Sequence, residues 1–294
     1  MASSTAHRQS ARQQKSKGRK GGKKAGKLTD TRYSAATSDR HVLYEKAVQE
    51  PEAEIDLIRQ MWREQHTRPC RSIREDFCGT SQVAMQWVKD DPANTAVCVD
   101  LDPEVLEWAR ARSLERLDDE QRSRIDWRLE DVRTTAPGAV DCVLAMNFSY
   151  YLFMERAELL RYFRHVREGL VDDGLFLLDA YGGSEAFAEI EEPRKLDGFT
   201  YIWDQNSYDP ISGRAVNYIH FEFPDGTRME RAFEYVWRLW TLPELRELLT
   251  EAGFRDVVIY WEGTDEDGEG NGEFTPAEVG EACEGWVAYL VAKK

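Results

Sequence analysis

The 294-residue chain is 41% hydrophobic and 11% aromatic, and it carries a formal net charge of −15. This length and composition are sufficient for one sizeable buried core, and no run of about 18 apolar residues is present that would span a membrane. The first residues, MASSTAHRQSARQQK, lack the apolar centre of a signal peptide, so a cytoplasmic location is expected.

The cysteines and histidines are scattered. The five cysteines, Cys70, Cys78, Cys98, Cys142 and Cys283, form no C-x-x-C pair, and the five histidines do not have the spacing that places two of them on one helical face. We therefore expect reduced, buried cysteines and no metal site.

The charge is divided between two parts of the chain. Residues 1–27 hold nine Lys or Arg and no acid, which leaves 30 basic and 54 acidic residues, a net charge of −24, in the remainder. Residues 1–29 contain almost nothing apolar, so we expect a disordered basic tail. The tail is compatible with an arm that binds nucleic acid, but a solubilising extension of an acidic protein is the favoured interpretation.

The first regular elements are expected to be helices. Between Asp39 and Gln65 apolar residues recur at helical intervals, and Pro51 marks the start of a second helix. These helices form a predicted N-terminal cap at residues 30–70.

A strand, a tight turn, a helix and a second strand are predicted across Ser72–Arg110. Asp100, at the end of the second strand, follows Gly79 in the turn by 21 positions. A βαβ unit with an acid at this distance binds adenosine-type cofactors, because the carboxylate accepts hydrogen bonds from the ribose hydroxyls. The turn lacks the three glycines of G-x-G-x-x-G, which argues against a dinucleotide.

Glu75, Cys78-Gly79-Thr80 and Asp100 together resemble the first two motifs of class I S-adenosylmethionine-dependent methyltransferases. The resemblance extends from about Ser72 to Ala292. It implies an α/β fold with a Rossmann-like, mostly parallel seven-stranded sheet and helices on both faces. Phe77 stands where the family has its first glycine. A phenylalanine is accommodated there if the backbone keeps a negative φ, but it would cover part of the methionine end of the pocket, which glycine leaves open.

The resemblance also implies which residues bind S-adenosylmethionine. They are Glu75, Phe77, Gly79, Thr80, Asp100, Leu101, Asp131, Val132 and Asn147. Asp131 follows a predicted strand at Ile125–Leu129 and matches the family's adenine-binding acid. The helical cap covers the cofactor in many members of the family, which makes Tyr33 and Tyr44 candidate contacts, although simple aromatic packing is favoured for both.

The methyl acceptor is expected at the ends of the next two strands. The apolar run Val140–Phe148 is typical of a buried parallel strand and leads into a polar and aromatic cluster, and Tyr181 follows the strand after it. We predict that four residues orient the acceptor: Asn147, Tyr150, Tyr151 and Tyr181.

Residues 199–240 interrupt the βα alternation with period-two patterns and turn signals, which predicts an antiparallel β insertion. The insertion holds eleven of the chain's 33 aromatic residues, so we expect it to form a wall of the acceptor cavity. Thr241 and Glu244 form a capping-box pattern at the start of a helix, and Trp286–Ala292 predicts a final strand. With its cap and insertion, the methyltransferase domain is expected to span residues 30–294.

The segment Glu262–Glu284 contains nine acids and no Lys, Arg or His. It is interpreted as a mobile acidic lid that attracts a cationic acceptor and repels polyphosphate.

The favoured function is in-line methyl transfer from S-adenosylmethionine to a small polar molecule, one that is cationic or bears an amine. An RNA or protein methyltransferase that uses the basic tail, and a non-catalytic cofactor-fold interaction protein, remain as alternatives. Partners other than the small acceptor are not favoured, no membrane association is expected, and the acceptor atom and oligomeric state stay open.

Overall fold

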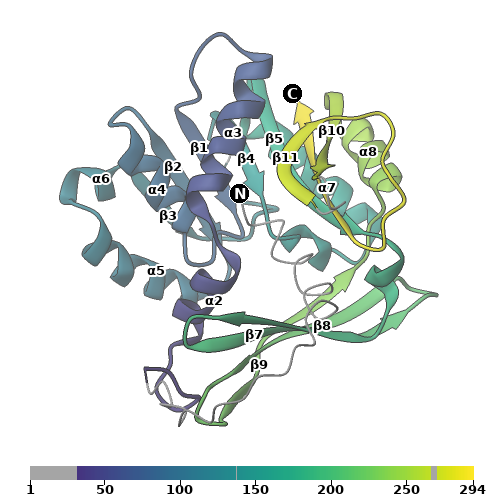
Figure 1. Ribbon diagram of the computed structural model, residues 1–294. Helices are drawn as coiled ribbons and strands as arrows, with labels where there is room; N and C mark the ends of the chain where they lie inside the picture. Colours follow the sequence, from purple (N-terminus) through teal and green to yellow (C-terminus); the bar gives the residue numbers. More distant parts are fainter. Residues whose placement is uncertain (1–31, 137, 266–269) are drawn as a thin grey trace.

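The computed structural model describes residues 32–136, 138–265 and 270–294 (Figure 1). The predicted tail at residues 1–29 lies outside these ranges. The helices are α2 (Arg40–Val48), α3 (Pro51–Gln65), α4 (Gln82–Asp90), α5 (Pro103–Arg116), α6 (Asp119–Ser123), α7 (Arg156–Glu168) and α8 (Leu242–Glu251), with short 3-10 helices η1 (Ser149–Leu152) and η2 (Ser184–Phe187). Among the described residues, no helix is both long and apolar enough to cross a membrane.

The central sheet contains the strands β1 (Ser72–Asp76), β2 (Thr95–Asp100), β3 (Ile125–Leu129), β4 (Val140–Ala145), β5 (Leu170–Gly182), β10 (Arg255–Thr264), β11 (Gly270–Pro276) and β12 (Trp286–Lys293). Their order is β11-β10-β12-β5-β4-β1-β2-β3. Strands β1 to β5 pair in parallel, whereas β12, β10 and β11 each pair antiparallel to a neighbour. The predicted Rossmann-like, mostly parallel sheet is confirmed, with eight strands in place of seven.

The extra strand corrects the prediction of a mobile lid at residues 262–284. Strand β11 pairs with β10, and Phe274 and Glu262 are buried at the sheet edge. The carboxylate of Glu262 accepts a hydrogen bond from the backbone N–H of Gly272 at 3.1 Å. Most of the described segment from Glu262 to Pro276 is therefore sheet. Residues 266–269 of the predicted lid lie outside the described residues.

A second sheet contains β6 (Ile190–Leu196), β7 (Phe199–Asp209), β8 (Arg214–Glu222) and β9 (Arg228–Arg238), all antiparallel. The insertion starts at β6, nine residues before its predicted start at position 199. The β6 sequence IEEPRKL includes a proline and few apolar residues, a composition that only an edge strand tolerates. Figure 1 shows this sheet crossing below the central one.

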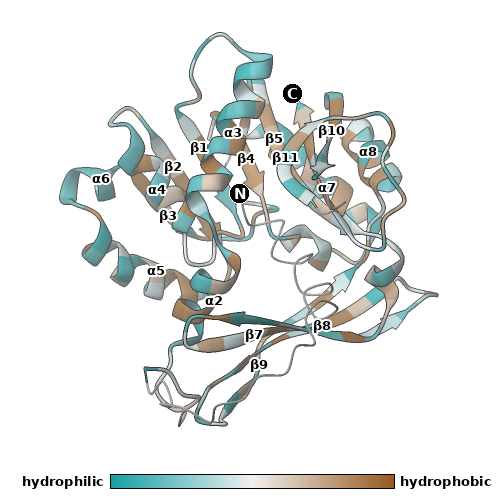
Figure 2. Cartoon of the chain, in the orientation of Figure 1, coloured by the Kyte–Doolittle hydropathy of each residue, from teal (hydrophilic) through white to brown (hydrophobic). Residues whose placement is uncertain are grey.

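The core lies on both faces of the central sheet, because successive side chains of a strand point in opposite directions. Val143 and Phe176 join the cluster that contains α7 and α8, whereas Leu144 and Leu177 join the one that contains α3 and α4. Figure 2 shows the strands of this sheet as the most hydrophobic part of the fold.

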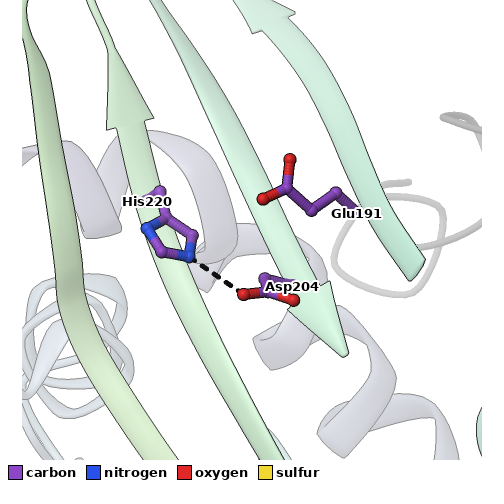
Figure 3. A group of neighbouring side chains, drawn as sticks. All are labelled: Glu191, Asp204 and His220. Atoms are coloured by element: carbon purple, nitrogen blue, oxygen red, sulfur yellow. Dashed lines mark hydrogen bonds and ion pairs between the residues drawn. The ribbon is translucent and has the colours of Figure 1, made fainter. Parts of the chain in front are cut away.

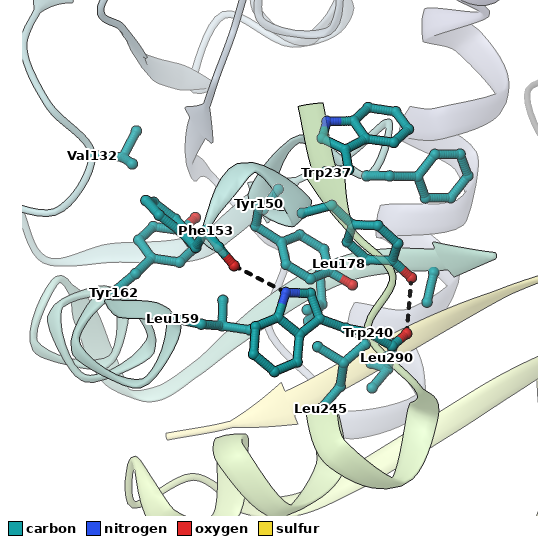
Figure 4. Packing of buried hydrophobic residues seen from close by; sticks show 14 of the residues in the cluster. Val132, Tyr150, Phe153, Leu159, Tyr162, Leu178, Trp237, Trp240, Leu245 and Leu290 are labelled. Atoms are coloured by element: carbon teal, nitrogen blue, oxygen red, sulfur yellow. Dashed lines mark hydrogen bonds between the residues drawn. The ribbon is translucent and has the colours of Figure 1, made fainter. Parts of the chain in front are cut away.

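The first of these clusters also holds the second sheet in place. Trp240, which follows β9, is 2% exposed and donates from Nε1 to the carbonyl of Phe153 at 3.1 Å (Figure 4). Thr241, the next residue, is the N-cap of α8, and its predicted capping box with Glu244 is confirmed. The chain therefore returns from the insertion to the central sheet through a rigid connection.

Helix α2 lies between the two sheets. Glu45 forms an ion pair with Arg116 of α5 at 2.7 Å, and the carbonyl of Ala47 accepts a hydrogen bond from Arg194 of β6. Helix α2 thus contacts both α5, which packs beside the central sheet, and β6 of the insertion.

Candidate active site

A cavity of about 560 Å³ lies where the carboxyl ends of β1, β2 and β4 face α2 and β9. The strand ends of the central sheet and the turns and helices that follow them contribute Glu75, Asp76, Phe77, Cys78, Gly79, Thr80, Asp100, Asp102, Val105, Met146, Asn147, Ser149 and Leu152. The cap contributes Arg40, His41, Tyr44 and Gln49, and the insertion contributes the continuous run Arg231–Trp237. In an open α/β sheet this edge is the expected ligand site.

The turn after β1 is built from left-handed backbone. Phe77 has φ +57° and Gly79 has φ +49°. Phe77 therefore does not keep the negative φ that would accommodate a phenylalanine without strain. Its ring packs edge-on against Tyr162 with centroids 5.7 Å apart, which compensates for strain that a glycine would avoid. A Cβ added at Gly79 would have no heavy atom within 4 Å, so the backbone here borders open space.

Asp100 supports this turn. One carboxylate oxygen accepts the N–H of Gly79 at 2.8 Å, and the other accepts the N–H of Asp102 at 3.0 Å. Burial raises the pKa of Asp100, and these backbone donors oppose that rise. Each oxygen has a second lone pair for a hydroxyl group in the cavity.

Glu75 lies beneath the turn with 8% of its surface exposed. Its Oε2 accepts the N–H of Ala84, in the first turn of α4, at 3.1 Å. Burial raises the pKa of Glu75 to about 8, and the neighbouring carboxyl of Glu54 adds to this effect. A cation in the cavity would favour the ionised form.

The opposite wall is aromatic. Tyr44 of α2 packs on Phe233 with ring centroids 5.0 Å apart, and Tyr235 packs on Trp237 at 4.7 Å. The three β9 rings alternate along the strand and so point to one face. The prediction that the insertion walls a cavity is confirmed, and of the two candidate tyrosines Tyr33 and Tyr44, Tyr44 is among the residues that line it.

Comparison with known proteins identifies this architecture. A family model described as "Methyltransferase domain" matches residues 78–176. "Putative methyltransferase GWCH70_2453" of Geobacillus sp. (strain WCH70) is 27% identical over 233 residues, which are 76% of this chain and 85% of that protein. Residues 78–176 therefore match a methyltransferase domain, and the whole fold resembles that of a solved S-adenosylmethionine-dependent methyltransferase.

Solved structures share the fold of this methyltransferase. An S-adenosylmethionine-dependent methyltransferase from Clostridium acetobutylicum ATCC 824 aligns over 86% of this chain and 96% of its own, with a TM-score of 0.66 and 17% identity. The sugar N-methyltransferase KedS8 from Streptoalloteichus sp. ATCC 53650 aligns over 94% and 99%, with a TM-score of 0.59 and 17% identity. At this identity the likeness concerns the fold.

The methyltransferase cavity contains six of the predicted cofactor residues. They are Glu75, Phe77, Gly79, Thr80, Asp100 and Asn147. The other three lie elsewhere: Leu101 is 66% exposed, Val132 is buried in the core, and Asp131 is paired with Arg133 at 2.6 Å. The Arg133 hydrogen bonds hold the pKa of Asp131 below its usual value. Its assignment to adenine stays a prediction.

Three of the four predicted acceptor residues do not line the cavity. Tyr150 and Tyr151 are fully buried, and their hydroxyls donate to the carbonyls of Asp179 at 2.7 Å and Trp240 at 3.2 Å. The ring of Tyr181 stacks on that of Tyr151 with centroids 5.6 Å apart. These tyrosines lie in the packing behind the aromatic wall, and this position does not support a direct role for their hydroxyls.

Asn147 does line the cavity, in a turn with φ +58°. The N–H groups of Asn147 and Phe148 each donate to the carboxylate of Asp179 at 2.8 Å. Burial raises the pKa of Asp179 to about 7. The sequence prediction missed Asp179, although an acid that ends the apolar run Leu175–Leu178 is a signal for a buried polar role.

Gln49, which was not among the predicted site residues, links the cap to the turn after β1. Thr80 Oγ1 donates to Oε1 of Gln49 at 2.8 Å, and both residues line the cavity. Gln49 follows α2 directly. No local pattern in the sequence indicates Gln49, because only tertiary packing brings it to the turn after β1.

Proposed function

We propose that this methyltransferase transfers the methyl group of S-adenosylmethionine in line to a small polar, amine-bearing acceptor held between the turn after β1 and the aromatic wall. The observation that carries the proposal is the shared cavity, which both halves of the fold line. A cavity of about 560 Å³ is in the range of small-molecule sites. The sugar N-methyltransferase KedS8, which shares the fold, supports an amine-bearing acceptor.

The residues present fit the cofactor. Its adenosine carries a ribose diol, for which Asp100 has free lone pairs beside the backbone of Gly79. Its sulfonium and ammonium groups are cationic, and Glu75 lines the cavity at the end of β1 as an acid without a cationic side-chain partner among the described residues. When bound, the cofactor supplies an electrophilic methyl group on a neutral leaving group.

The residues of the chain would position the acceptor and desolvate it. Tyr44, Tyr235 and Trp237 present ring faces and hydroxyl groups, a combination that suits an ammonium or polar alkyl group. Alignment of the reacting atoms can supply about 7–11 kcal/mol of the barrier reduction, so a dedicated base is not required.

The acceptor nitrogen must lose a proton before or during transfer. His41 lines the cavity, and burial, followed by the charge of Arg40, lowers its pKa below the ordinary value of 6.5. His41 is therefore neutral near pH 7 and can receive that proton.

The test is a transfer assay with the full chain, S-adenosylmethionine and a panel of small amines, hydroxy acids and thiols, with product mass as the readout. We expect a gain of one methyl group on an amine. Transfer only to hydroxyl or thiol acceptors would overturn the acceptor class, and binding of the cofactor without transfer to any acceptor would overturn the proposed activity.

A further inference from the structure

A cluster of ligand-type side chains lies on the face of the second sheet that is turned away from the cavity. Trp203 packs on Trp237 of the aromatic wall with centroids 5.8 Å apart. The next residue, Asp204, therefore points to the opposite face. There it meets Glu191 of β6 and His220 of β8, and Figure 3 shows the three side chains converging.

The donor atoms of these residues have spacings suited to one metal ion. They lie within 4.8 Å of one another, and Nε2 of His220 is 3.2 Å from Oδ2 of Asp204. Two ligand atoms about 2.0–2.2 Å from a tetrahedral zinc ion are about 3.3–3.5 Å apart. Asp204 and His220 are 9% and 4% exposed, so the sheet holds them in place. Glu191 is exposed and pairs with Arg228 at 3.2 Å, a contact that it would exchange for the ion.

The other ring nitrogen of His220 has the partner that a metal-bound imidazole needs. Nδ1 lies 2.6 Å from Oε2 of Glu230 and accepts the backbone N–H of Arg231 at 3.0 Å. These two groups hold the ring in the orientation that directs Nε2 at Asp204. Either a proton or a metal ion therefore joins Nε2 to Asp204.

The charge around the cluster favours a divalent cation. Arg228 contacts Glu191, Glu222 and Glu230 at 3.0–3.2 Å, and the guanidinium of Arg231 lies 4.4 Å from the ring centre of Tyr218. With Asp204, four carboxylates face two guanidinium groups. The carboxylates outnumber the guanidinium groups, and this excess of negative charge favours a cation.

We propose that Glu191, Asp204 and His220 form a structural site for a divalent transition metal of the zinc type, with Glu230 holding the imidazole. An imidazole ligand selects such ions over magnesium and calcium. The ion would join β6, β7 and β8 and stiffen the sheet whose other face forms the aromatic wall. Sequence spacing predicted no metal site, because each ligand comes from a different strand.

The test is calorimetric titration of the chelator-treated full chain with zinc alone. We expect one tight equivalent in the wild type and a rise in melting temperature on binding. Glu191→Gln, at an exposed position that should not impair folding, should weaken this equivalent by about 10–100-fold. Glu222→Gln removes a neighbouring carboxylate outside the donor set and should change the affinity less than about twofold.

Asp204→Asn serves as a second ligand variant, with circular dichroism as the check that it folds. The proposal is overturned if the wild type binds no stoichiometric zinc, or if Glu191→Gln and Glu222→Gln weaken binding equally. Zinc bound with unchanged affinity by both ligand variants would assign the ion to another place in the chain and would also overturn it.

Discussion

Buried carboxyl groups surround the methyltransferase cavity, and their protonation links stability to pH. Glu54 and Glu75 both have a pKa raised to about 8, mainly by burial, and Asp179 has one raised to about 7. In the unfolded chain these groups ionise near 4. They therefore contribute full stability below that pH and lose it as the pH rises through the native values.

Glu75→Gln tests this linkage. Glutamine keeps the oxygen that accepts the N–H of Ala84 but cannot ionise. Without cofactor, the variant and the wild type should be about equally stable near pH 5, and the variant should be more stable at pH 8 by on the order of a few kcal/mol. Urea unfolding at the two pH values measures the difference, with the exposed Glu52→Gln as control. A difference that does not change with pH would contradict the assignment.

Asp100→Ala should weaken S-adenosylmethionine binding by about 1.5–3 kcal/mol, the range for hydrogen bonds to a charged group. The reason is its position beside Gly79, with lone pairs available to the ribose. Isothermal titration calorimetry gives the affinity, and Asp126→Ala, an exposed acid on β3, should leave it unchanged. Equal affinities for Asp100→Ala and the wild type would remove Asp100 from the site.

Phe77 allows a test of backbone strain. At φ +57° a glycine avoids the steric cost that any side chain incurs. Phe77→Gly should therefore be more stable than Phe77→Ala by about 1 kcal/mol, the reverse of the usual order. The comparison of the two variants by denaturant unfolding cancels the lost ring packing, and an alanine variant of equal or greater stability would argue against a left-handed turn.

At the scale of elements, the link between α2 and the turn after β1 has a measurable energy. Thr80→Val keeps the side-chain shape but removes the 2.8 Å hydrogen bond to Gln49, and should cost about 0.5–1.5 kcal/mol of unfolding free energy. Thr95→Val, at an exposed position that starts β2, should cost less than about 0.5 kcal/mol. Equal losses in the two variants would mean that the contact adds nothing.

The elements differ in how well the sequence predicted them. β4 was predictable because its mostly apolar sequence is typical of a central strand. All six of its residues are buried in the structure. β6 and β11 were not predictable, because both are edge strands whose polar residues resemble loops, and pairing alone makes them strands.

The same distinction applies to the site. Glu75, Gly79 and Asp100 have a fixed local spacing that indicates their place at the cavity. Asp179 and Tyr44 reach the site only through tertiary packing, and Tyr150 shares its strand end with Asn147 yet faces the core. The local sequence pattern predicts where a strand ends. The direction in which each side chain points depends on the elements packed against it.

At the scale of the whole molecule, charge separates the tail from the rest of the chain. Because the basic tail contributes almost nothing apolar, a truncation starting near Asp30 should retain turnover on a small acceptor within about twofold. Steady-state kinetics of the two chains tests this, with circular dichroism to confirm folding. A folded but inactive truncation would favour the RNA or protein methyltransferase alternative.

The central claim is that one cavity holds both S-adenosylmethionine and a small amine. The most direct measurement is mass spectrometry of a small-metabolite extract incubated with the full chain and methyl-labelled S-adenosylmethionine, beside the Asp100→Ala variant. The account predicts label on an amine of low molecular mass in the wild-type reaction, reduced by about tenfold or more in the variant at limiting cofactor. Label found only on protein or nucleic acid, or equal labelling by both chains, would contradict it.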